Sequence, residues 1–375
     1  MQPLDHLRAL VAINSFTHNR EGVLACGAYC ADMFGELGFR PEFVRSVTED
    51  CGDHLFLERD GEIPLVLVGH LDTVYPPDTD FAWRDEGARI HGPGVADIKG
   101  GIVVLWEALR RLPELDRFHL RVFLNASEEG GCADFPKLAR ARVRDDTRAC
   151  LVFEPGYDLG DGQTSIVTAR KGSGRFRLDA YGREAHSGNE HHRGASAVRE
   201  LARAIETIES WTDYEQDVTW NVGTIDGGTA VNCVPEFATA GVDLRVWTPE
   251  EMQAGHARIH ALAGSLVSHD GEARTRIEVH DGPGYPPWPP NEQTDALAKI
   301  VTELEPTVRP LQRRGGSDGA FLWDLAPTVD GLGVVGRDMH CSVHDPANGR
   351  EQESMDRASF EPRVDLAVRL LERLA

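Results

Sequence analysis

The sequence predicts an α/β protein, with a larger α/β/α domain and a smaller α+β domain inserted into it. Up to about residue 165, single apolar segments of strand length alternate with helical segments. The following strands alternate polar and apolar residues, which is typical of a sheet with one solvated face. After residue 282 the first pattern returns. We therefore expect the larger domain to comprise residues 1–166 and 282–375, and the inserted domain residues 167–281.

The composition narrows the classes of partner. The chain has 375 residues, of which 41% are hydrophobic and 27% charged, and its formal net charge is −22. Nucleic acids and anionic membranes bind basic faces, so this charge argues against both as main partners. The first residues lack a signal-peptide pattern, and no later apolar run has membrane-spanning length. We therefore expect a cytoplasmic protein.

The cysteines predict a reducing compartment rather than a disulfide framework. Their number, seven, is odd, and none forms a Cys-x-x-Cys pair. Cys26 and Cys30 stand four apart in a probable helix, which would suit a metal or redox pair, but two small core side chains are the favoured interpretation. We expect buried thiols at Cys26, Cys30, Cys51, Cys132, Cys150, Cys233 and Cys341.

The first part of the chain has the signals of helices followed by strands. Residues 1–38 show helical apolar spacing and end at a glycine, which predicts one or two helices. Strands are predicted at 55–57 and 65–68. The second strand leads to His70 and Asp72, which share one face of an extended chain. We interpret His70 as a metal ligand and Asp72 as the carboxylate that holds its ring.

Acidic groups follow other elements in the same way. Asp97 lies in a glycine-containing loop before a predicted helix near residue 102, where a ligand or a second backbone can come close. Further strands end before acids, and open α/β sheets carry their chemistry at such ends. These strands are 120–125, followed by Glu128 and Glu129, and 149–153, followed by Glu154.

The inserted segment has a pattern of its own. Alternating strands are predicted at 175–181 and 237–246, with an amphipathic helix at 195–208 between them. A helix near 249–268 and a strand near 274–280 complete a β-α-β-type unit with a helical face and a sheet face.

The candidate residues together suit a two-metal site. Two imidazoles with several carboxylates favour a pair of zinc-like ions with one bridging carboxylate, and they lack the thiolates of a structural zinc site. Of the adjacent glutamates, Glu128 can face the substrate as a general base while Glu129 binds metal. The candidates are His70, Asp72, Asp97, Glu128, Glu129, Glu154 and His340.

Several motifs resemble the co-catalytic zinc exopeptidases and deacylases of the aminoacylase and glutamate carboxypeptidase family, which includes carboxypeptidase G-like enzymes. The resemblance covers nearly the whole chain. Its motifs are Gly69-His70-Leu71-Asp72, Gly94-Val95-Ala96-Asp97, Ser127-Glu128-Glu129-Gly130, Phe153-Glu154-Pro155, the segment from Gly182 to His186, Asn232 with Arg245, and Gly315 to Gly319 followed by His340.

The resemblance implies a division of labour at the metals. His70, Asp97 and Glu154 would hold one zinc ion, and Asp97, Glu129 and His340 the other, with Co²⁺ or Mn²⁺ as possible substitutes. Glu128 would be the general base, Asp72 the partner of His70, and the peptide bond after Asp97 a candidate for the cis isomer. His344 competes with His340 as the last ligand, because the acidic pair expected soon after that ligand is delayed to Glu353 and its neighbour.

The resemblance also implies a fold and partners. The larger domain would be a phosphorylase/hydrolase-like catalytic domain, and the inserted, ferredoxin-like domain a lid and the dimerisation surface of a homodimer. His186 would reach the partner subunit's active site and help to stabilise the oxyanion. A substrate with a free carboxylate is suggested by Arg245. Further candidate substrate-binding residues are Asn232, Gly316, Ser317, Arg170 and Lys171.

We expect metal-assisted hydrolysis of an amide bond. The leading hypothesis is a glutamate carboxypeptidase-like exopeptidase that removes a carboxyl-terminal amino acid from a peptide or N-acyl substrate. One alternative is an N-acyl-amino-acid deacylase, and a second is a catalytically silent binding protein of the same fold. A phosphate-binding interpretation of the glycine-rich segment at 94–101 fails, because it lacks the Gly-Lys-Ser/Thr ending.

Overall fold

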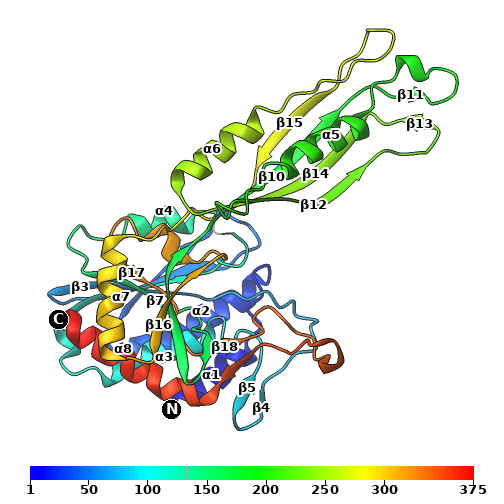
Figure 1. Ribbon diagram of the computed structural model, residues 1–375. Coiled ribbons are helices and arrows are strands. Elements are labelled where there is room, and N and C mark those ends of the chain that lie inside the picture. The colour runs from blue at the N-terminus through cyan, green and yellow to red at the C-terminus, as the bar shows by residue number, and fades with distance from the viewer. Residues whose placement is uncertain (132) are drawn as a thin grey trace. The chain divides into compact units, whose positions relative to one another are not determined.

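The computed structural model describes residues 1–131 and 133–375 and divides into two compact units (Figure 1). Unit 1 comprises residues 1–169, 290–313 and 317–375. Unit 2 comprises residues 170–289 together with 314–316. The chain leaves unit 1 and later returns to it, so the predicted fold class, an α/β protein with an inserted α+β unit, is confirmed. The functional domain borders at residues 167 and 281 stay a prediction.

Unit 1 is built on a six-stranded sheet with the order β1-β2-β6-β3-β7-β17. Strands β6, β3, β7 and β17 are parallel, and β1 and β2 form an antiparallel edge. All eight residues of β3 are buried, which accounts for its continuous apolar run. The bounds are β1 Arg40–Arg45, β2 Asp53–Arg59, β3 Ile63–His70, β6 Phe118–Asn125, β7 Ala149–Val152 and β17 Thr328–Val329.

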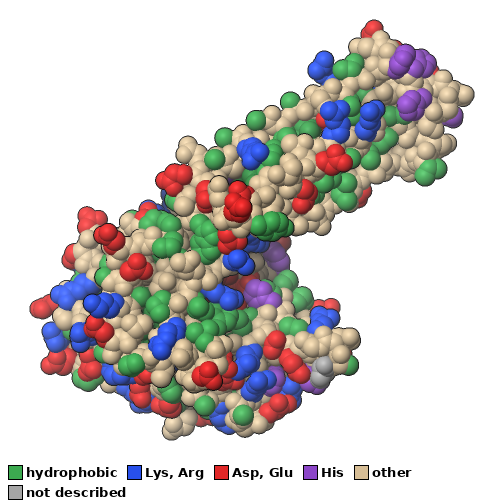
Figure 2. Space-filling view, viewed as in Figure 1, with side chains coloured by type: hydrophobic (Ala, Val, Ile, Leu, Met, Phe, Trp, Pro, Cys, Tyr) green, Lys and Arg blue, Asp and Glu red, His purple; other side chains and the backbone are tan. Residues whose placement is uncertain are grey.

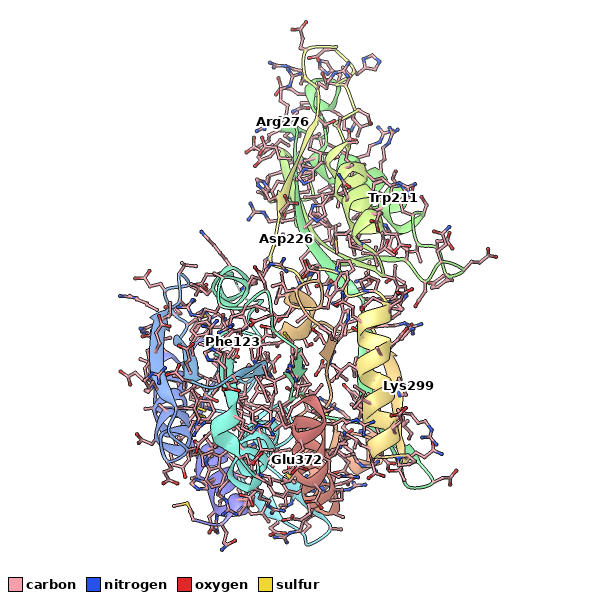
Figure 3. The ribbon with its side chains drawn as sticks, turned by 90° about the vertical axis from the view of Figure 1, so that its left-hand side faces the viewer. Phe123, Trp211, Asp226, Arg276, Lys299 and Glu372 are labelled. Carbon is pink, nitrogen blue, oxygen red and sulfur yellow. The ribbon has the colours of Figure 1, made fainter. Side chains whose placement is uncertain are left out.

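Helices cover both faces of this sheet. On one face, Leu65 and Leu67 of β3 join a core shared with α1, α2, α3, α7 and α8, and α7 packs beside α8 (Figure 3). On the other face, the rings of Phe56 and Phe123 meet edge to face, and Phe56 stacks on Phe135 of α4. The helices are α1 Pro3–Ala12, α2 Arg20–Gly35, α3 Lys99–Arg111, α4 Phe135–Arg140, α7 Glu292–Leu304 and α8 Phe360–Leu374.

Two small sheets complete unit 1. One, with the order β18-β19-β5-β4, brings the segment after residue 350 against the loop that precedes α3. The other has the order β16-β9-β8. Their strands are β4 Arg84–Asp85, β5 Arg89–His91, β8 Asp158–Gly160, β9 Gln163–Arg170, β16 Val308–Arg313, β18 Gly336–Arg337 and β19 Ser354–Asp356.

Unit 2 is an antiparallel sheet with the order β12-β14-β10-β15 and two helices, α5 and α6. Along the chain the elements follow the β-α-β-β-α-β order of ferredoxin-like folds. Its separate core includes Leu178, Leu201, Trp220 and Leu244. The bounds are β10 Gly172–Tyr181, α5 Ala197–Glu209, β12 Thr219–Gly227, β14 Phe237–Val246, α6 Pro249–His260 and β15 Arg276–Asp281, with the short pair β11 Ala185–His186 and β13 Cys233–Val234.

The helix predicted at 249–268 is shorter than expected, since α6 ends at His260. The reason lies in the buried carboxylate of Glu200 on α5. It accepts hydrogen bonds from the backbone N–H groups of Ser265 (2.8 Å) and Leu266 (2.7 Å). These amide groups therefore bind a side chain of another element instead of continuing the helix.

The cysteine predictions are partly confirmed. Cys26, Cys30, Cys51 and Cys150 are buried free thiols. Cys233 and Cys341 are free but only half-buried, so the expectation of burial was wrong for these two. Cys132 lies outside the described residues. In the described part of the chain, no helix is both long and apolar enough to cross a membrane.

Candidate dinuclear metal centre

The predicted metal ligands gather at the carboxyl edge of the parallel strands in unit 1. His70 is the last residue of β3, and Glu154 follows the end of β7 by two residues. Asp97 lies just before α3. The start of this helix lies so close to the end of β7 that a side chain at Gly101 would clash with the carbonyl oxygen of Phe153. The glycine thus permits the close backbone approach expected from the sequence.

The distances divide the ligands into two sets that share Asp97. His70 Nε2 lies 3.1 Å from Asp97 Oδ1 and 3.6 Å from Glu154 Oε1. His340 Nε2 lies 3.3 Å from Asp97 Oδ2 and 3.1 Å from Glu129 Oε1. The two oxygens of Asp97 therefore face different imidazoles, as a bridging carboxylate requires. The peptide bond between Asp97 and Ile98 is cis, as the resemblance implied.

His340 and His344, the two candidates for the last metal ligand, have different contacts in the structure. Both side chains are 53% exposed, but His340 reaches Asp97 and Glu129, whereas Nδ1 of His344 lies 2.8 Å from Glu351. His340 also has a left-handed backbone with φ of 67°. Non-glycine residues in this region carry strain that is often found at functional sites. The structure thus brings His340, and not His344, to the cluster.

Asp72 contacts His70, as predicted, and several further groups. His70 Nδ1 lies 3.0 Å from the backbone oxygen of Asp72 and 3.4 Å from its Oδ1. The same carboxylate accepts hydrogen bonds from the backbone N–H groups of Glu128 (3.0 Å) and Glu129 (3.1 Å) and from the hydroxyl of Thr17 (2.7 Å). Asp72 therefore positions both the imidazole and the adjacent pair of glutamates.

Glu353 supports Asp97 from behind. This fully buried carboxylate accepts hydrogen bonds from the backbone N–H groups of Ala96 (2.9 Å) and Asp97 (3.0 Å) through Oε1. Its Oε2 accepts the hydroxyl of Tyr75 at 2.6 Å. Sequence reasoning noted Glu353 only as a displaced family position and did not assign this role. Tyr75 was missed altogether, since it lies in a loop without a motif.

A second buried group near the site was also missed. Asn125, the last residue of β6, donates a hydrogen bond from Nδ2 to Asp318 Oδ1 at 2.9 Å. Burial, and then the charge of Glu128, raise the pKa of Asp318 well above its ordinary value. Its position directly after Ser317, in a glycine-rich segment, was the available signal.

Charge crowding indicates that the cluster fits divalent cations. Burial raises the pKa of Glu129 to about 8, in spite of the hydrogen bond with His340, and the charges of Asp97 and Glu128 add to this rise. Burial and the charge of Asp97 raise the pKa of Glu154 well above its usual range. Hydrogen bonds with Asp97 and Glu129 raise the pKa of His340 to about 11. Carboxylates so crowded need positive charge, and nitrogen and oxygen donors suit zinc.

The predicted residues of unit 2 separate into two groups. His186 of β11 and Asn232 lie together. The backbone N–H of Ser187 donates to the backbone oxygen of Asn232 at 3.0 Å, and β11 pairs with β13. Histidine side chains gather at this end of unit 2 (Figure 2), with His191 and His192 close in sequence. We call this end, residues 183–195 and 228–236, the distal loops.

Arg245 lies at the other end of the sheet. It pairs with Ser173 at the start of β10, and its Nε lies 2.7 Å from Asp243 Oδ2. From Gly172 to Tyr181 the strand spans about 30 Å at about 3.3 Å per residue. The structure therefore does not bring Arg245 and Asn232 of one chain together.

Three further candidates have structural partners. Lys171 is buried, and its Nζ lies 2.9 Å from Asp217 Oδ1. Arg170 donates to the backbone oxygens of Gly315 and Gly316 at 3.0 Å. The hydroxyl of Ser317 donates to Asp330 Oδ2 at 2.8 Å. Arg170 and Lys171 are thus both buried in protein contacts, and their role in substrate binding stays a prediction.

Comparison with known proteins agrees with this geometry. The model of the peptidase family M20/M25/M40 matches residues 66–373. The chain belongs to this family. Members are zinc-dependent metallopeptidases and amidohydrolases, typically with two zinc ions, so the chain is a metal-dependent hydrolase and not a catalytically silent protein.

Similar proteins with known activities differ in their substrates. Carboxypeptidase G2 of Pseudomonas sp. (strain RS-16) is 25% identical over 97% of this chain and 87% of its own. A succinyl-diaminopimelate desuccinylase of Methylobacterium sp. (strain 4-46) is 30% identical over 90% of this chain and 89% of its own.

Solved structures support the fold. A tripeptidase of Staphylococcus aureus superposes with a TM-score of 0.77 at 19% identity, covering 99% of this chain and 97% of the other. An M20 family metallo-carboxypeptidase of Sulfolobus solfataricus gives a TM-score of 0.71 at 15% identity, covering 100% and 99%.

Proposed function

We propose that this enzyme is a dizinc exopeptidase that releases a carboxyl-terminal amino acid from a peptide or an N-acyl amino acid. The observation that carries the proposal is Asp97, whose two oxygens face His70 and His340 separately. The similarity to a carboxypeptidase over 97% of the chain supports the reaction class.

The ligands of the proposed centre follow from the two sets. His70, Asp97 and Glu154 would hold one ion, and Asp97, Glu129 and His340 would hold the other. Such ions polarise a carbonyl group and lower the pKa of a bound water. Glu353 and Asp72 keep Asp97, Glu128 and Glu129 in place through backbone hydrogen bonds.

Glu128 is the proposed general base. Its backbone is fixed by Asp72 while its side chain is half-buried beside the ligand Glu129. It takes a proton from the attacking water and later gives it to the leaving amine, since a general base becomes a general acid in the second half of an amide hydrolysis.

Unit 2 is proposed to supply substrate contacts and a dimer interface. Strand β12 is an edge strand with mostly exposed residues, including Ile225 at 61%, so a second copy can pair with it. Because the distal loops lie about 30 Å of strand away from the start of β10, we propose that His186 and Asn232 act on the partner subunit's site. Arg245 and Gly316, at the start of the strand, are proposed to bind the substrate carboxylate.

His186 is suited to donate a hydrogen bond to an oxyanion. Its Nδ1 accepts hydrogen bonds from the backbone N–H groups of Gly188 (3.1 Å) and Asn189 (3.0 Å). In the neutral ring the proton therefore resides on Nε2. The side chain is exposed, so Nε2 is available to a group outside the loop.

A second candidate function is the deacylation of an N-acyl amino acid. The 30% identity to a desuccinylase over 90% of this chain favours it. Carboxypeptidase and deacylase cleave the same type of bond and differ in which side of the amide is recognised. We further propose a cytoplasmic location, since the six described cysteines are free thiols.

A substrate matrix tests the proposal. Zinc-loaded protein is assayed against N-acyl amino acids in which the acyl group and the amino acid are varied independently, and against dipeptides. The carboxypeptidase hypothesis predicts that the released amino acid determines kcat/KM, with acyl groups exchangeable. Dependence on the acyl group instead favours the deacylase. No hydrolysis of any amide with a free carboxylate contradicts both.

A further inference from the structure

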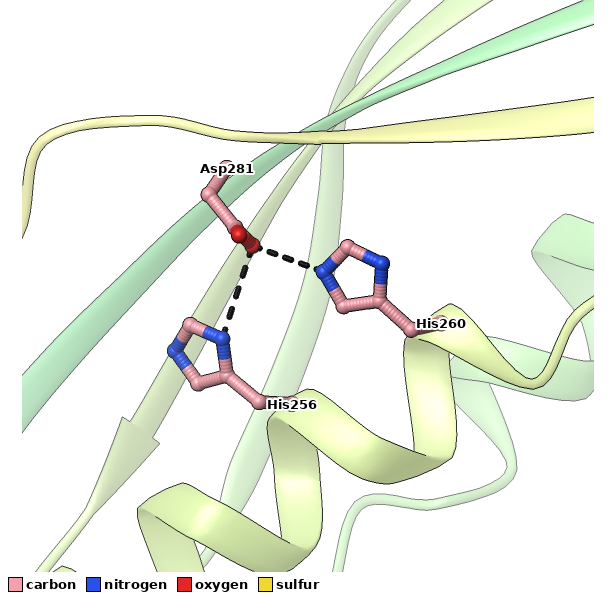
Figure 4. A group of neighbouring side chains, drawn as sticks. All are labelled: His256, His260 and Asp281. Atoms are coloured by element: carbon pink, nitrogen blue, oxygen red, sulfur yellow. Dashed lines mark hydrogen bonds and ion pairs between the residues drawn. The ribbon is translucent and has the colours of Figure 1, made fainter.

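Unit 2 carries a cluster of metal-binding side chains that the proposed catalytic chemistry does not use. His256 and His260 stand four residues apart on α6, so they project from the same face of the helix (Figure 4). Asp281, the last residue of β15, points toward both. One potential ligand atom from each residue lies within 4.8 Å of the other two.

One of the two distances from Asp281 matches that of a zinc site, and the other is that of a direct hydrogen bond. Asp281 Oδ1 lies 3.4 Å from His256 Nδ1 and 2.9 Å from His260 Nε2. Ligand atoms bound tetrahedrally at about 2.0–2.1 Å from a zinc ion are about 3.4 Å apart. The side chains are about half exposed, at 40%, 41% and 54% in chain order, so small rotations can widen the shorter distance.

The rings are held in position by their neighbours. The two imidazoles are nearly parallel, with an interplanar angle of 16° and centroids 6.4 Å apart. The edge-to-face contacts of Phe176 with His256 and His260 support both rings from the core of unit 2. Packing therefore already restricts both imidazole rings, which lowers the entropic cost of ordering them as metal ligands.

A second cluster of potential metal ligands, in unit 1, differs from this one because arginines pair with its carboxylates. Glu58, Asp60 and His119 of unit 1 are also close together. There, however, Arg121 pairs with Glu58 at 2.8 Å and Arg40 pairs with Asp60 at 2.9 Å, so arginines already neutralise both carboxylates. Within the described part of the chain, Asp281 forms ion pairs only with His256 and His260.

We propose that His256, His260 and Asp281 bind a divalent transition-metal ion such as Zn²⁺, separately from the catalytic centre. Two imidazoles and one carboxylate are suitable ligands for such an ion and leave at least one position open to water. Because the ligands come from α6 and β15, the ion links the second helix of unit 2 to the edge of its sheet. Binding to the folded state alone would then stabilise this unit.

The test is a calorimetric titration of zinc chloride into the full-length protein, after its catalytic centre has been loaded with zinc and excess metal removed. The wild type is expected to bind one further ion per chain. His260→Ala and Asp281→Asn should each weaken that binding about tenfold or more, since the loss of a mere supporting partner of a ligand already costs about that much.

His280→Ala is the matched control. His280 is the neighbour of Asp281 on β15, but its Nε2 pairs with Asp179 at 3.2 Å, outside the cluster. This variant should keep the additional site. Excess zinc should also raise the thermal midpoint of the wild type and of His280→Ala, but not that of His260→Ala, whose folding is checked by circular dichroism. No additional ion in the wild type, or unchanged binding in both His260→Ala and Asp281→Asn, would overturn the proposal.

Discussion

Glu353 fixes Asp97, the residue shared by the two ions of the proposed catalytic centre. It binds two consecutive backbone amides, of Ala96 and Asp97, and is itself held by the Tyr75 hydroxyl. The local motifs around His70, Asp97, Glu128 and Glu154 were sufficient to predict the cluster from the sequence. Glu353 and Tyr75 could not be predicted in the same way, because their contact joins residues 278 positions apart and leaves no local spacing.

Replacing Glu353 with Ala should weaken metal binding without removing a ligand. The backbone N–H groups of Ala96 and Asp97 each lose a hydrogen bond, and the loss of supporting partners typically costs about 10–100-fold in metal affinity. Equilibrium titration with a zinc chelator measures this. Glu351→Ala is the control, because Glu351 is a half-buried acid two residues earlier that pairs with His344. Equal zinc affinities in the two variants would contradict the role of Glu353.

His340→Ala and His344→Ala should differ in metal content. His340 contacts Asp97 and Glu129, whereas His344 contacts Glu351. We expect His340→Ala to retain about one catalytic zinc ion per chain after dialysis, and His344→Ala to retain both. Elemental analysis of both proteins, made in the background of His260→Ala to exclude the surface site, decides between them. The reverse result would transfer the ligand role to His344.

At the scale of elements, burial determines which predictions succeeded. Strand β3 was predicted because all of its residues are buried and its sequence is apolar from Ile63 to Gly69. Strand β1 was missed because its residues are almost all exposed, so Arg40–Arg45 shows no apolar pattern. The end of α6 was misplaced because it depends on Glu200, a residue of another helix.

Glu200 should contribute pH-dependent stability to unit 2. Burial would raise its pKa, but hydrogen bonds from Thr275, Ser265 and Leu266 outweigh this and lower the pKa below its ordinary value. A lowered folded-state pKa stabilises the protein above the unfolded value of about 4.3, and this contribution is lost as the pH falls through the folded-state pKa.

Glu200→Gln is therefore expected to cost about 2 kcal/mol of unfolding free energy at pH 7, as for hydrogen bonds to a charged group. The difference from wild type should narrow as the pH falls below about 4. Denaturant unfolding at several pH values measures it, with the exposed Glu206→Gln of the same helix as control. A difference that does not change with pH would show that Glu200 is not bound as the charged form.

At the scale of the whole molecule, pattern changes near residues 165 and 282 indicated an insertion, and the compact units divide at Arg170 and Pro289. The positions of paired site residues were harder to predict. Asn232 and Arg245 are thirteen residues apart, yet β14 is extended between them and carries them to opposite ends of the sheet. One chain therefore does not bring these two candidate substrate-binding residues together.

Mixing two inactive variants tests whether sites are shared between subunits. If His186 acts on the partner subunit's site, a dimer of one Glu128→Gln chain and one His186→Ala chain contains one intact site. Random exchange of equal amounts should then restore about a quarter of wild-type activity. Activity that stays at the level of the separate variants, although mass spectrometry shows mixed dimers, would place His186 in its own subunit's site or outside any site.

Turnover and metal content of Glu128→Gln address the proposed chemistry itself. Glu128 is assigned to proton transfer and not to metal binding, so the variant should contain as much zinc per chain as the wild type. Its kcat should fall by about 10²–10⁴-fold, the usual contribution of a positioned general base. Near wild-type turnover with full zinc occupancy would contradict the assignment of Glu128 and, with it, the proposed mechanism.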